Sequence, residues 1–291
     1  MISIVIATYN RARTLPQSLA SCLAQTDKDI EVVVIDDGST DDTEQLIQEQ
    51  IKNDARIRYI KLEKNQGASV ARNRGIQEAK GEWVMVWDSD DTLYSDAIAT
   101  IKKTISLYPH TVVVSASARM MKGDKVIPYP VLPEGLVSLE EVLCKKISNN
   151  EKVRCARKEV YFKAPYVSRN IDFIVGARLR AQGEWFHLAQ PLGDVFLEGT
   201  DSLTRARKKF NRTRSAERAP HLKLYLADFG ETLRRSCPRR FAEISYGASI
   251  ASACAGIKKD AIYFAFSSVK TNPFSFRGYA ALLFAVFSPR R

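Results

Sequence analysis

Two aspartates separated by one serine, Asp88-Ser89-Asp90, are the residues in this sequence best suited to hold a metal ion. They directly follow the apolar run Trp83–Trp87, and Asp91 adds a third carboxylate. Carboxylate oxygens are hard ligands that suit Mg²⁺ or Mn²⁺, and such a cation neutralises charge on a departing phosphate. Aspartate and serine also cap helices well, so an acidic turn before a helix is the competing interpretation.

Polar residues follow two other apolar runs in the same way. Thr8-Tyr9-Asn10 comes after Ile2–Ala7, and Asp36-Asp37-Gly38-Ser39 comes after Ile30–Ile35. An aspartate at this position accepts hydrogen bonds from a base or a ribose, and a tyrosine ring offers a flat surface for a base. The alternatives are a glycine turn with a helix cap for the aspartates, and an ordinary strand-end residue for the tyrosine.

A positively charged side chain, that of Arg72, is predicted near these strand ends. Asn65-Gln66-Gly67 reads as a glycine turn before a helix over Ala68–Ala79, and Arg72 lies in the first turns of that helix. From there its guanidinium could reach an anion, whereas the alternative is an ordinary surface arginine.

The elements that must position these side chains alternate between strand-like and helix-like stretches. Because the strand-like runs are apolar on both faces and separated by helices, we expect a parallel sheet covered by helices, an α/β fold. The carboxyl ends of parallel strands lie at one edge, where ligands bind. The predicted strands are Ile2–Ala7, Ile30–Ile35, Ile57–Leu62 and Trp83–Trp87, and the predicted helices are Leu15–Ala24, Ser39 or Thr40 to Ile51, and Ala68–Ala79.

The rest of the chain is less regular. The pattern predicts helices over Ser95–Leu107, Leu139–Lys146 and Asp172–Gln182, strands over Thr111–Ala118 and Trp185–Leu188, and a hairpin at Lys122-Gly123-Asp124. Beyond Arg205 the sequence reads mostly as helix. Residues 203–291 hold 18 Lys/Arg against 5 Asp/Glu, a net charge of +13, whereas residues 1–202 hold 26 against 28, a net charge of −2. We therefore expect a domain over 1–202 and a basic helical region over 203–291.

Four of these motifs, in this order, resemble the family 2 inverting glycosyltransferases, which have the GT-A fold. The residues that carry the resemblance are Ser3 to Asn10, Val34 to Asp41, Asn65-Gln66-Gly67 with Ala71 to Ile76, and Asp88 to Asp91. The resemblance is strong over residues 1–110, the expected nucleotide-sugar half, and weak over 111–202, the expected acceptor half. Many members have proline where Ala7 stands, a position that acts through its backbone.

The resemblance implies roles for individual residues. The segment Ala7, Thr8 and Tyr9, together with Asp37 and Arg72, would hold the nucleoside, usually uridine. Asp88 would face the ribose or the donor sugar, and Asp90 would bind Mn²⁺ or Mg²⁺ with help from Asp88 and Asp91.

An inverting transfer also needs a carboxylate that deprotonates the acceptor hydroxyl. Counting back from Gly183, the resemblance places this base at Asp172, with Ile171 where the family usually has glutamate. A helix cap is the alternative role for Asp172. Asp194 and Asp201 are weaker rivals as the base.

The C-terminal region mixes basic residues with aromatic and aliphatic ones over 203–291. This composition suits helices that lie on an anionic membrane surface, which a lipid-linked acceptor would require. A helical lid or an oligomer contact is the alternative. The charge comes without any nucleic-acid-binding motif, so we expect no nucleic-acid partner.

The remaining features bear on location. The five cysteines are scattered without a CxxC pair, so we expect neither a disulfide framework nor a zinc site, and a reducing cytoplasm. The N-terminus shows no signal-peptide pattern and no run of eighteen apolar residues occurs. The sequence thus predicts a cytoplasmic protein, peripheral on the inner face of the plasma membrane.

The overall prediction is a hexosyltransferase that moves a sugar from a UDP-sugar to a saccharide or lipid-linked saccharide, with GDP- and dTDP-linked donors as the alternatives. The family resemblance implies a role in bacterial surface-polysaccharide synthesis. Two rivals keep a similar fold: a catalytically silent nucleotide- or sugar-binding protein, and a sugar nucleotidyltransferase. The latter normally carries a glycine-rich basic loop where Thr8-Tyr9-Asn10 stands. A dehydrogenase and a P-loop NTPase are disfavoured, because no GxGxxG follows a strand and no GxxxxGK[ST] occurs.

Overall fold

The apolar runs of the first ninety residues form neighbouring strands of one sheet in the computed structural model, which describes residues 1–128, 132–144, 153–166, 172–197 and 212–287. Within those ranges the strands follow the order β3-β2-β1-β4-β9-β6-β10-β5, with β7 on β6 and β8 on β10. The strands are β1 (Ile2–Thr8), β2 (Ile30–Asp36), β3 (Ile57–Lys61), β4 (Trp83–Asp88), β5 (Thr92–Leu93), β6 (Thr111–Lys122), β7 (Lys125–Ile127), β8 (Gly135–Leu136), β9 (Val153–Arg157) and β10 (Glu184–Phe196).

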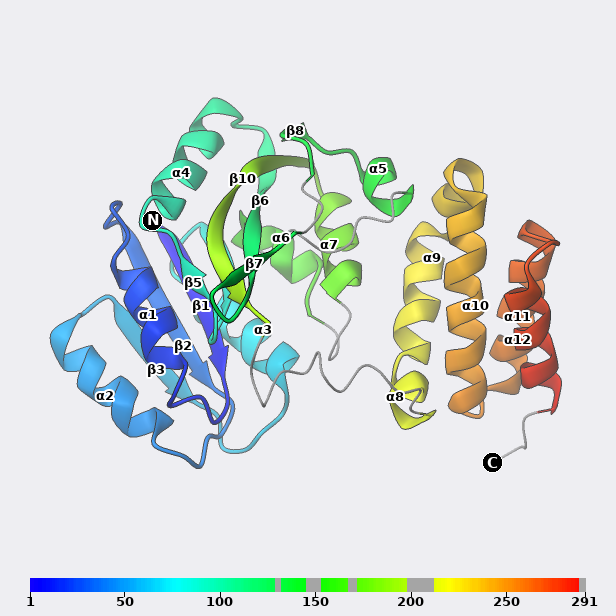
Figure 1. Ribbon diagram of the computed structural model, residues 1–291, viewed down its shortest axis with the longest axis horizontal. Coiled ribbons are helices and arrows are strands. Elements are labelled where there is room, and N and C mark those ends of the chain that lie inside the picture. The colour runs from blue at the N-terminus through cyan, green and yellow to red at the C-terminus, as the bar shows by residue number, and fades with distance from the viewer. Residues whose placement is uncertain (129–131, 145–152, 167–171, 198–211, 288–291) are drawn as a thin grey trace. The chain divides into compact units, whose positions relative to one another are not determined.

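Helices cover both faces of this sheet (Figure 1). Ile4 of β1 packs in the apolar cluster that includes α1, α2 and α4, whereas its neighbour Val5 packs in the cluster that includes α3, α6 and α7. Successive side chains of a strand point to opposite faces, which explains why these runs are apolar at nearly every position. The helices are α1 (Leu15–Leu23), α2 (Thr43–Asn53), α3 (Ala68–Glu78), α4 (Ala97–Leu107), α6 (Lys158–Lys163) and α7 (Asp172–Arg180).

The parallel part of the predicted sheet is confirmed, and the later part is mixed. Strands β1, β2, β3 and β4 pair in parallel. The sequence analysis missed β9, which lies antiparallel between β4 and β6. Two arginines interrupt its apolar pattern. Arg157 lies over Trp83 at 5.0 Å and Arg154 over Trp185 at 5.5 Å, measured from guanidinium carbon to ring centroid. These long-range contacts bury a strand that its own pattern does not reveal.

The start of α2 differs from the prediction. The sequence predicts a cap at Ser39 or Thr40, but this helix begins at Thr43. The Ser39 hydroxyl accepts a hydrogen bond from the backbone N–H of Asn10 (2.8 Å), and the Thr40 N–H donates to the Asn10 side chain (2.8 Å). Both residues therefore bind the loop after β1 instead of starting a helix.

The chain divides into two compact units, Met1–Ser138 with Ile147–Thr200, and Leu139–Lys146 with Asp201–Arg291. The division after Thr200 lies close to the expected boundary at 202, but Leu139–Lys146 belongs to the second unit. The helices of that unit are α5 (Leu139–Cys144), α8 (Arg212–Glu217), α9 (Ala219–Ser236), α10 (Pro238–Cys254), α11 (Lys258–Thr271) and α12 (Phe276–Phe287). Within the described ranges, no helix combines the length and the apolar character needed to cross a bilayer.

One disulfide joins Cys144 at the end of α5 to Cys237, which lies between α9 and α10. The expectation that no disulfide is present is therefore wrong at this pair, because a separation of 93 residues leaves no spacing pattern in the sequence. Cys22, Cys155 and Cys254 are buried and do not take part in a disulfide.

Candidate functional site

The register of the parallel strands brings the predicted site residues to one edge of the sheet. Thr8 at the end of β1 pairs with Asp36 at the end of β2, and Ala7 pairs with Asp88 at the end of β4. The segments that follow these three strands therefore start side by side. This is the convergence that the sequence predicted from the apolar runs alone.

The loop after β1 is fixed to the loop after β2 by side-chain hydrogen bonds. Asn10, which has a positive φ of 52°, is held through Ser39 and Thr40 as described above. The Asp41 carboxylate accepts from the Ala12 N–H at 3.2 Å. Tyr9 stays 43% exposed on this fixed loop, so its ring is available to a planar ligand.

Asp37 is bound more tightly than the sequence suggested. It is 3% exposed, and its two carboxylate oxygens accept the backbone N–H groups of Gln66 (2.8 Å) and Gly67 (2.7 Å). These hydrogen bonds connect the end of β2 to the start of α3. Each carboxylate oxygen has a further lone pair that can accept a hydrogen bond from a ligand.

Arg72 reaches the edge of the sheet from α3. This helix lies very close to β1, because a Cβ atom added at Gly75 would meet the Val5 side chain at 2.2 Å. Arg72 donates a hydrogen bond to Asp88 at 2.7 Å and lies over the ring of Tyr166, 5.3 Å from its centroid. The glycine thus sets how near the Arg72 guanidinium comes to the acids after β4.

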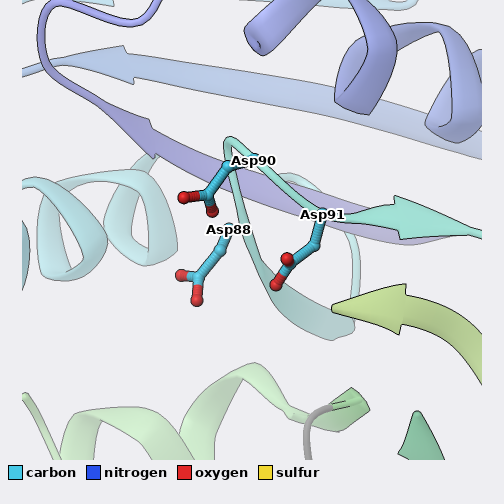
Figure 2. A group of neighbouring side chains, drawn as sticks. All are labelled: Asp88, Asp90 and Asp91. Carbon is cyan, nitrogen blue, oxygen red and sulfur yellow. The ribbon is translucent and has the colours of Figure 1, made fainter. Parts of the chain in front are cut away.

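The acids after β4 form the one cluster of potential metal ligands found in the described part of the chain. One carboxylate oxygen of each of Asp88, Asp90 and Asp91 lies within 4.8 Å of the other two, and Figure 2 shows the three side chains on this loop. Burial, followed by the negative charge of Asp88, raises the pKa of the Asp90 carboxyl, although Arg11 and Arg72 oppose the change. Such crowding of carboxylates favours a bound cation, which would relieve their repulsion.

Asp91 is placed differently from its two neighbours. It is 5% exposed, and its carboxylate accepts the backbone N–H of Phe196 at 3.0 Å. The indole N–H of Trp87 donates to the Asp91 carbonyl oxygen at 3.2 Å. Asp91 therefore fastens the acidic loop to the end of β10, while Asp88 is exposed and Asp90 is partly exposed.

Of the three candidates for the carboxylate that deprotonates the acceptor hydroxyl, only Asp194 has a side chain among the described residues. Asp172 is the first residue of α7, but its side chain lies outside the described residues, as does all of Asp201. Burial acts to raise the pKa of Asp194, but hydrogen bonds from Arg119 (2.7 and 2.8 Å) and Tyr94 (2.7 Å) outweigh it and hold that pKa below its usual value. A carboxylate held in this way is a poor proton acceptor.

Two residues of this site escaped the sequence analysis. Arg11 lies in the loop after β1, with its guanidinium nitrogen 3.9 Å from an Asp90 oxygen. Tyr166 is held next to α3 by Asn73, whose side chain bonds both the N–H and the carbonyl of Tyr166 at 2.9 and 2.7 Å. The position of Arg11 just after a strand end could have indicated it, whereas nothing in the sequence joins Tyr166 to a helix 93 residues earlier.

Comparisons with known proteins agree with this geometry. Residues 3–152, more than half of the chain, match the model of glycosyl transferase family 2. The chain is 38% identical over 112 residues to the GalNAc(5)-diNAcBac-PP-undecaprenol beta-1,3-glucosyltransferase of Campylobacter jejuni subsp. jejuni, a match that covers 38% of this chain and 36% of that protein.

Two solved structures share the fold. TarS residues 1–349 of S. aureus with UDP-GlcNAc has a TM-score of 0.62 at 17% identity, covering 98% of this chain and 79% of that one. The mannosyltransferase PcManGT of Pyrobaculum calidifontis with GDP-Man and Mn²⁺ has a TM-score of 0.57 at 17% identity, covering 98% and 85%. The chain spans 14% to 50% of the length of the curated relatives it matches.

Proposed function

Because the chain belongs to glycosyl transferase family 2, we propose that it transfers a hexosyl group from a nucleotide-sugar to a saccharide or lipid-linked saccharide, with inversion at the anomeric carbon. The observation that carries this proposal is the meeting of Tyr9, Arg72, Asp88 and Asp90 at the carboxyl ends of β1 and β4. An aromatic ring, a cation and clustered carboxylates are the groups that a nucleoside diphosphate with a divalent cation needs.

The nucleoside would lie at the end of β1. The exposed ring of Tyr9 can stack on the base, and the backbone of Ala7 and Thr8 can bond its edge. Asp37, buried beside them, would accept from the base or the ribose through its remaining lone pairs. The diphosphate would then lie towards Arg72, whose charge suits an anion.

The acidic loop fits a divalent cation, because its donors are hard oxygens that crowd within 4.8 Å of one another. Asp88 and Asp90 would hold Mn²⁺ or Mg²⁺, and Asp91 would fix the loop to β10. The cation supplies charge neutralisation for the diphosphate leaving group.

The chemical step needs one group from the protein. Asp172 would take the proton of the acceptor hydroxyl. At the same time the oxygen of that hydroxyl forms a bond to the anomeric carbon, and the bond from this carbon to the diphosphate oxygen breaks. The electron pair leaves with the diphosphate. Placement of Asp172 at the first residue of α7 is compatible with this role.

We propose a UDP-linked donor, a role in bacterial surface-polysaccharide synthesis and a cytoplasmic site of action at the inner face of the plasma membrane. One structural neighbour holds UDP-GlcNAc, and the Campylobacter relative is named for an undecaprenol-linked acceptor. Disulfides rarely persist in the cytoplasm, so at this location the Cys144–Cys237 disulfide would be reduced in the cell and would form when the purified protein is exposed to air.

The proposal is tested by measuring UDP release from a panel of UDP-sugars with Mn²⁺ present and acceptor saccharides added. We expect Asp172→Asn to lower kcat by about 10²-fold or more with UDP affinity retained, because a general base contributes roughly 10²–10⁴-fold. The matched control is Asp124→Asn, an exposed aspartate in the β6–β7 turn.

Two outcomes would contradict the proposal. UDP binding without turnover on any donor and acceptor would favour a silent binding protein of the same fold. Formation of a nucleotide-sugar from a nucleoside triphosphate and a sugar phosphate would favour a sugar nucleotidyltransferase.

A further inference from the structure

Large apolar side chains of α12 are exposed, Phe276, Tyr279, Leu283, Phe284 and Val286 among them. Its buried residues are small: Gly278, Ala281 and Ala285 follow each other at helical spacing. A Cβ atom at Gly278 would meet the Val269 side chain of α11 at 3.1 Å, so this small face lies against α11. A helix that serves only as core presents the opposite pattern, with large apolar residues buried.

The outward stripe of α12 consists of Phe276, Tyr279, Leu283 and Val286, spaced by three, four and three residues. Phe276 is 85% exposed and Leu283 is 61% exposed. Phe274, in the turn just before α12, is 97% exposed. We call these five residues the aromatic face.

A second exposed stripe lies on α11, the helix that packs against α12 (Figure 1). Lys259, Tyr263, Phe266 and Lys270 follow at intervals of four, three and four residues, so they share one side of the helix. Tyr263 and Phe266 are each about 60% exposed, at 61% and 60%. A lysine thus stands at each end of an aromatic pair.

The charged residues of the segment 261–291, which contains the aromatic face, have one sign. Residues 261–291 contain four basic residues, Lys270, Arg277, Arg290 and Arg291, and no aspartate or glutamate. Exposed aromatic rings flanked by cations match the boundary of an anionic bilayer, where rings sit among headgroups and cations attract acidic lipids.

We propose that the aromatic face docks the chain on an anionic lipid bilayer, with α12 lying in the plane of the interface. The proposal deepens the proposed function, on which it rests for the lipid-linked acceptor, but docking itself requires neither donor nor acceptor. An interfacial helix needs a large apolar side and nearby cations, and α12 with its flanking residues has both.

The charges disfavour a second copy of the chain as the occupant. A twofold symmetric interface places the same patch on both partners. Arg277 and Lys270 would then face the same cations of the other copy, with no acidic residue in 261–291 to pair with them. A bilayer that carries negative headgroups has no such conflict.

Sedimentation of the purified full chain with vesicles tests the proposal. One set of vesicles contains phosphatidylcholine alone, and the other contains phosphatidylcholine with phosphatidylglycerol. We expect binding to the second set, weakened by salt. Phe276→Ser with Leu283→Ser should lower the partition coefficient about tenfold or more, and Lys270→Gln with Arg277→Gln about fivefold for each cation.

The matched control is Leu107→Ser with Val126→Ser, two residues of the first unit that are 64% and 53% exposed. It should bind vesicles as the unchanged chain does. Absence of binding to anionic vesicles, or equal binding by the Phe276→Ser, Leu283→Ser variant, would overturn the proposal. So would a concentration-dependent dimer that the same variant abolishes. Failure here leaves UDP release in solution unaffected, so the two proposals fail separately.

Discussion

The Arg72 guanidinium donates a hydrogen bond to the Asp88 carboxylate at 2.7 Å while lying over the ring of Tyr166. This pair connects α3 to the end of β4 across the site. It places a cation next to an acid that is 52% exposed and is itself a predicted ligand of the metal and the donor. The cation is therefore positioned to meet a diphosphate that approaches the acidic loop.

Replacement of Arg72 by alanine should weaken UDP binding in the presence of Mn²⁺. A hydrogen bond to a charged group contributes about 1.5–3 kcal/mol, which corresponds to roughly 10- to 150-fold in Kd. Isothermal titration calorimetry measures this change. Arg74→Ala is the matched control on the same helix, because Arg74 pairs with Glu78 at 2.8 Å. Equal losses in both variants would remove Arg72 from the donor site.

Asp91 should act by positioning the loop and not as an essential metal ligand. Asp91→Ala leaves the Phe196 N–H without its acceptor and should lower the free energy of unfolding by about 1–3 kcal/mol. Asp91→Asn keeps an acceptor oxygen, so both stability and Mn²⁺ affinity should stay close to those of the unchanged chain. Urea denaturation followed by tryptophan fluorescence reports on this unit, since Trp83, Trp87 and Trp185 all belong to it.

The comparison variant for Asp91 is Asp90→Asn, which should lose Mn²⁺ affinity without a comparable loss of stability. A loss of Mn²⁺ affinity in Asp91→Asn as large as in Asp90→Asn would show that Asp91 is a ligand after all.

His187 should make the first unit less stable in acid. Its ring is buried between the hydroxyls of Ser115 (2.9 Å) and Ser117 (3.4 Å). Burial, with a smaller effect from Arg180, lowers the pKa of His187 to about 4 from 6.5. Between those values the unfolded chain binds a proton that the folded chain does not, so stability is full above pH 6.5 and falls towards pH 4. The loss amounts to about 3 kcal/mol at most.

Urea denaturation of the unchanged chain and of His187→Gln from pH 7 to pH 4 measures this contribution as a difference. Carboxylates with lowered pKa values also reduce the free energy of unfolding in acid, but they do so equally in both proteins. Their contribution therefore cancels in the difference between the two proteins. The slope should be smaller in His187→Gln. Identical slopes would mean that His187 does not titrate as described.

The disulfide should stabilise the second unit. Closing a loop of about 93 residues contributes up to roughly 4–5 kcal/mol in the chain-entropy model, and measured effects are usually about 2–4 kcal/mol. Dithiothreitol should therefore lower the stability of the helical unit, followed by circular dichroism, and leave the tryptophan signal of the first unit unchanged. The Cys144→Ser, Cys237→Ser double variant should not respond to dithiothreitol.

Alkylation of the unfolded, unreduced protein gives an independent count. Of five cysteines, Cys22, Cys155 and Cys254 should react. Reaction of all five would show that Cys144 and Cys237 are not joined.

The donor half of the site could be predicted from local patterns because each of its parts has a local signature. The strands β1, β2 and β4 are mostly apolar runs, and parallel pairing brings their ends together. The positions of Asp88, Asp90 and Arg72 follow from those runs and from the turn at Gly67.

The remaining features depend on contacts between distant residues, which no local pattern records. The engagement of Asp37 with Gln66 and Gly67 links two strand–helix units, and the Asp91–Phe196 bond joins positions 105 residues apart. Strand β9 was missed because its arginines are covered by tryptophans from other strands.

The central claim is that the edge formed by β1, β2 and β4 binds a nucleoside diphosphate together with a divalent cation. The most direct test is calorimetric titration with UDP, GDP, dTDP and CDP, with and without Mn²⁺. The titration compares the unchanged chain with Asp90→Ala, and Asp124→Ala is the control. We expect micromolar binding of UDP that requires Mn²⁺, is lost in Asp90→Ala and is kept in Asp124→Ala. Absence of binding to all four nucleotides with Mn²⁺ present would contradict it and leave the acids after β4 as a helix-capping turn.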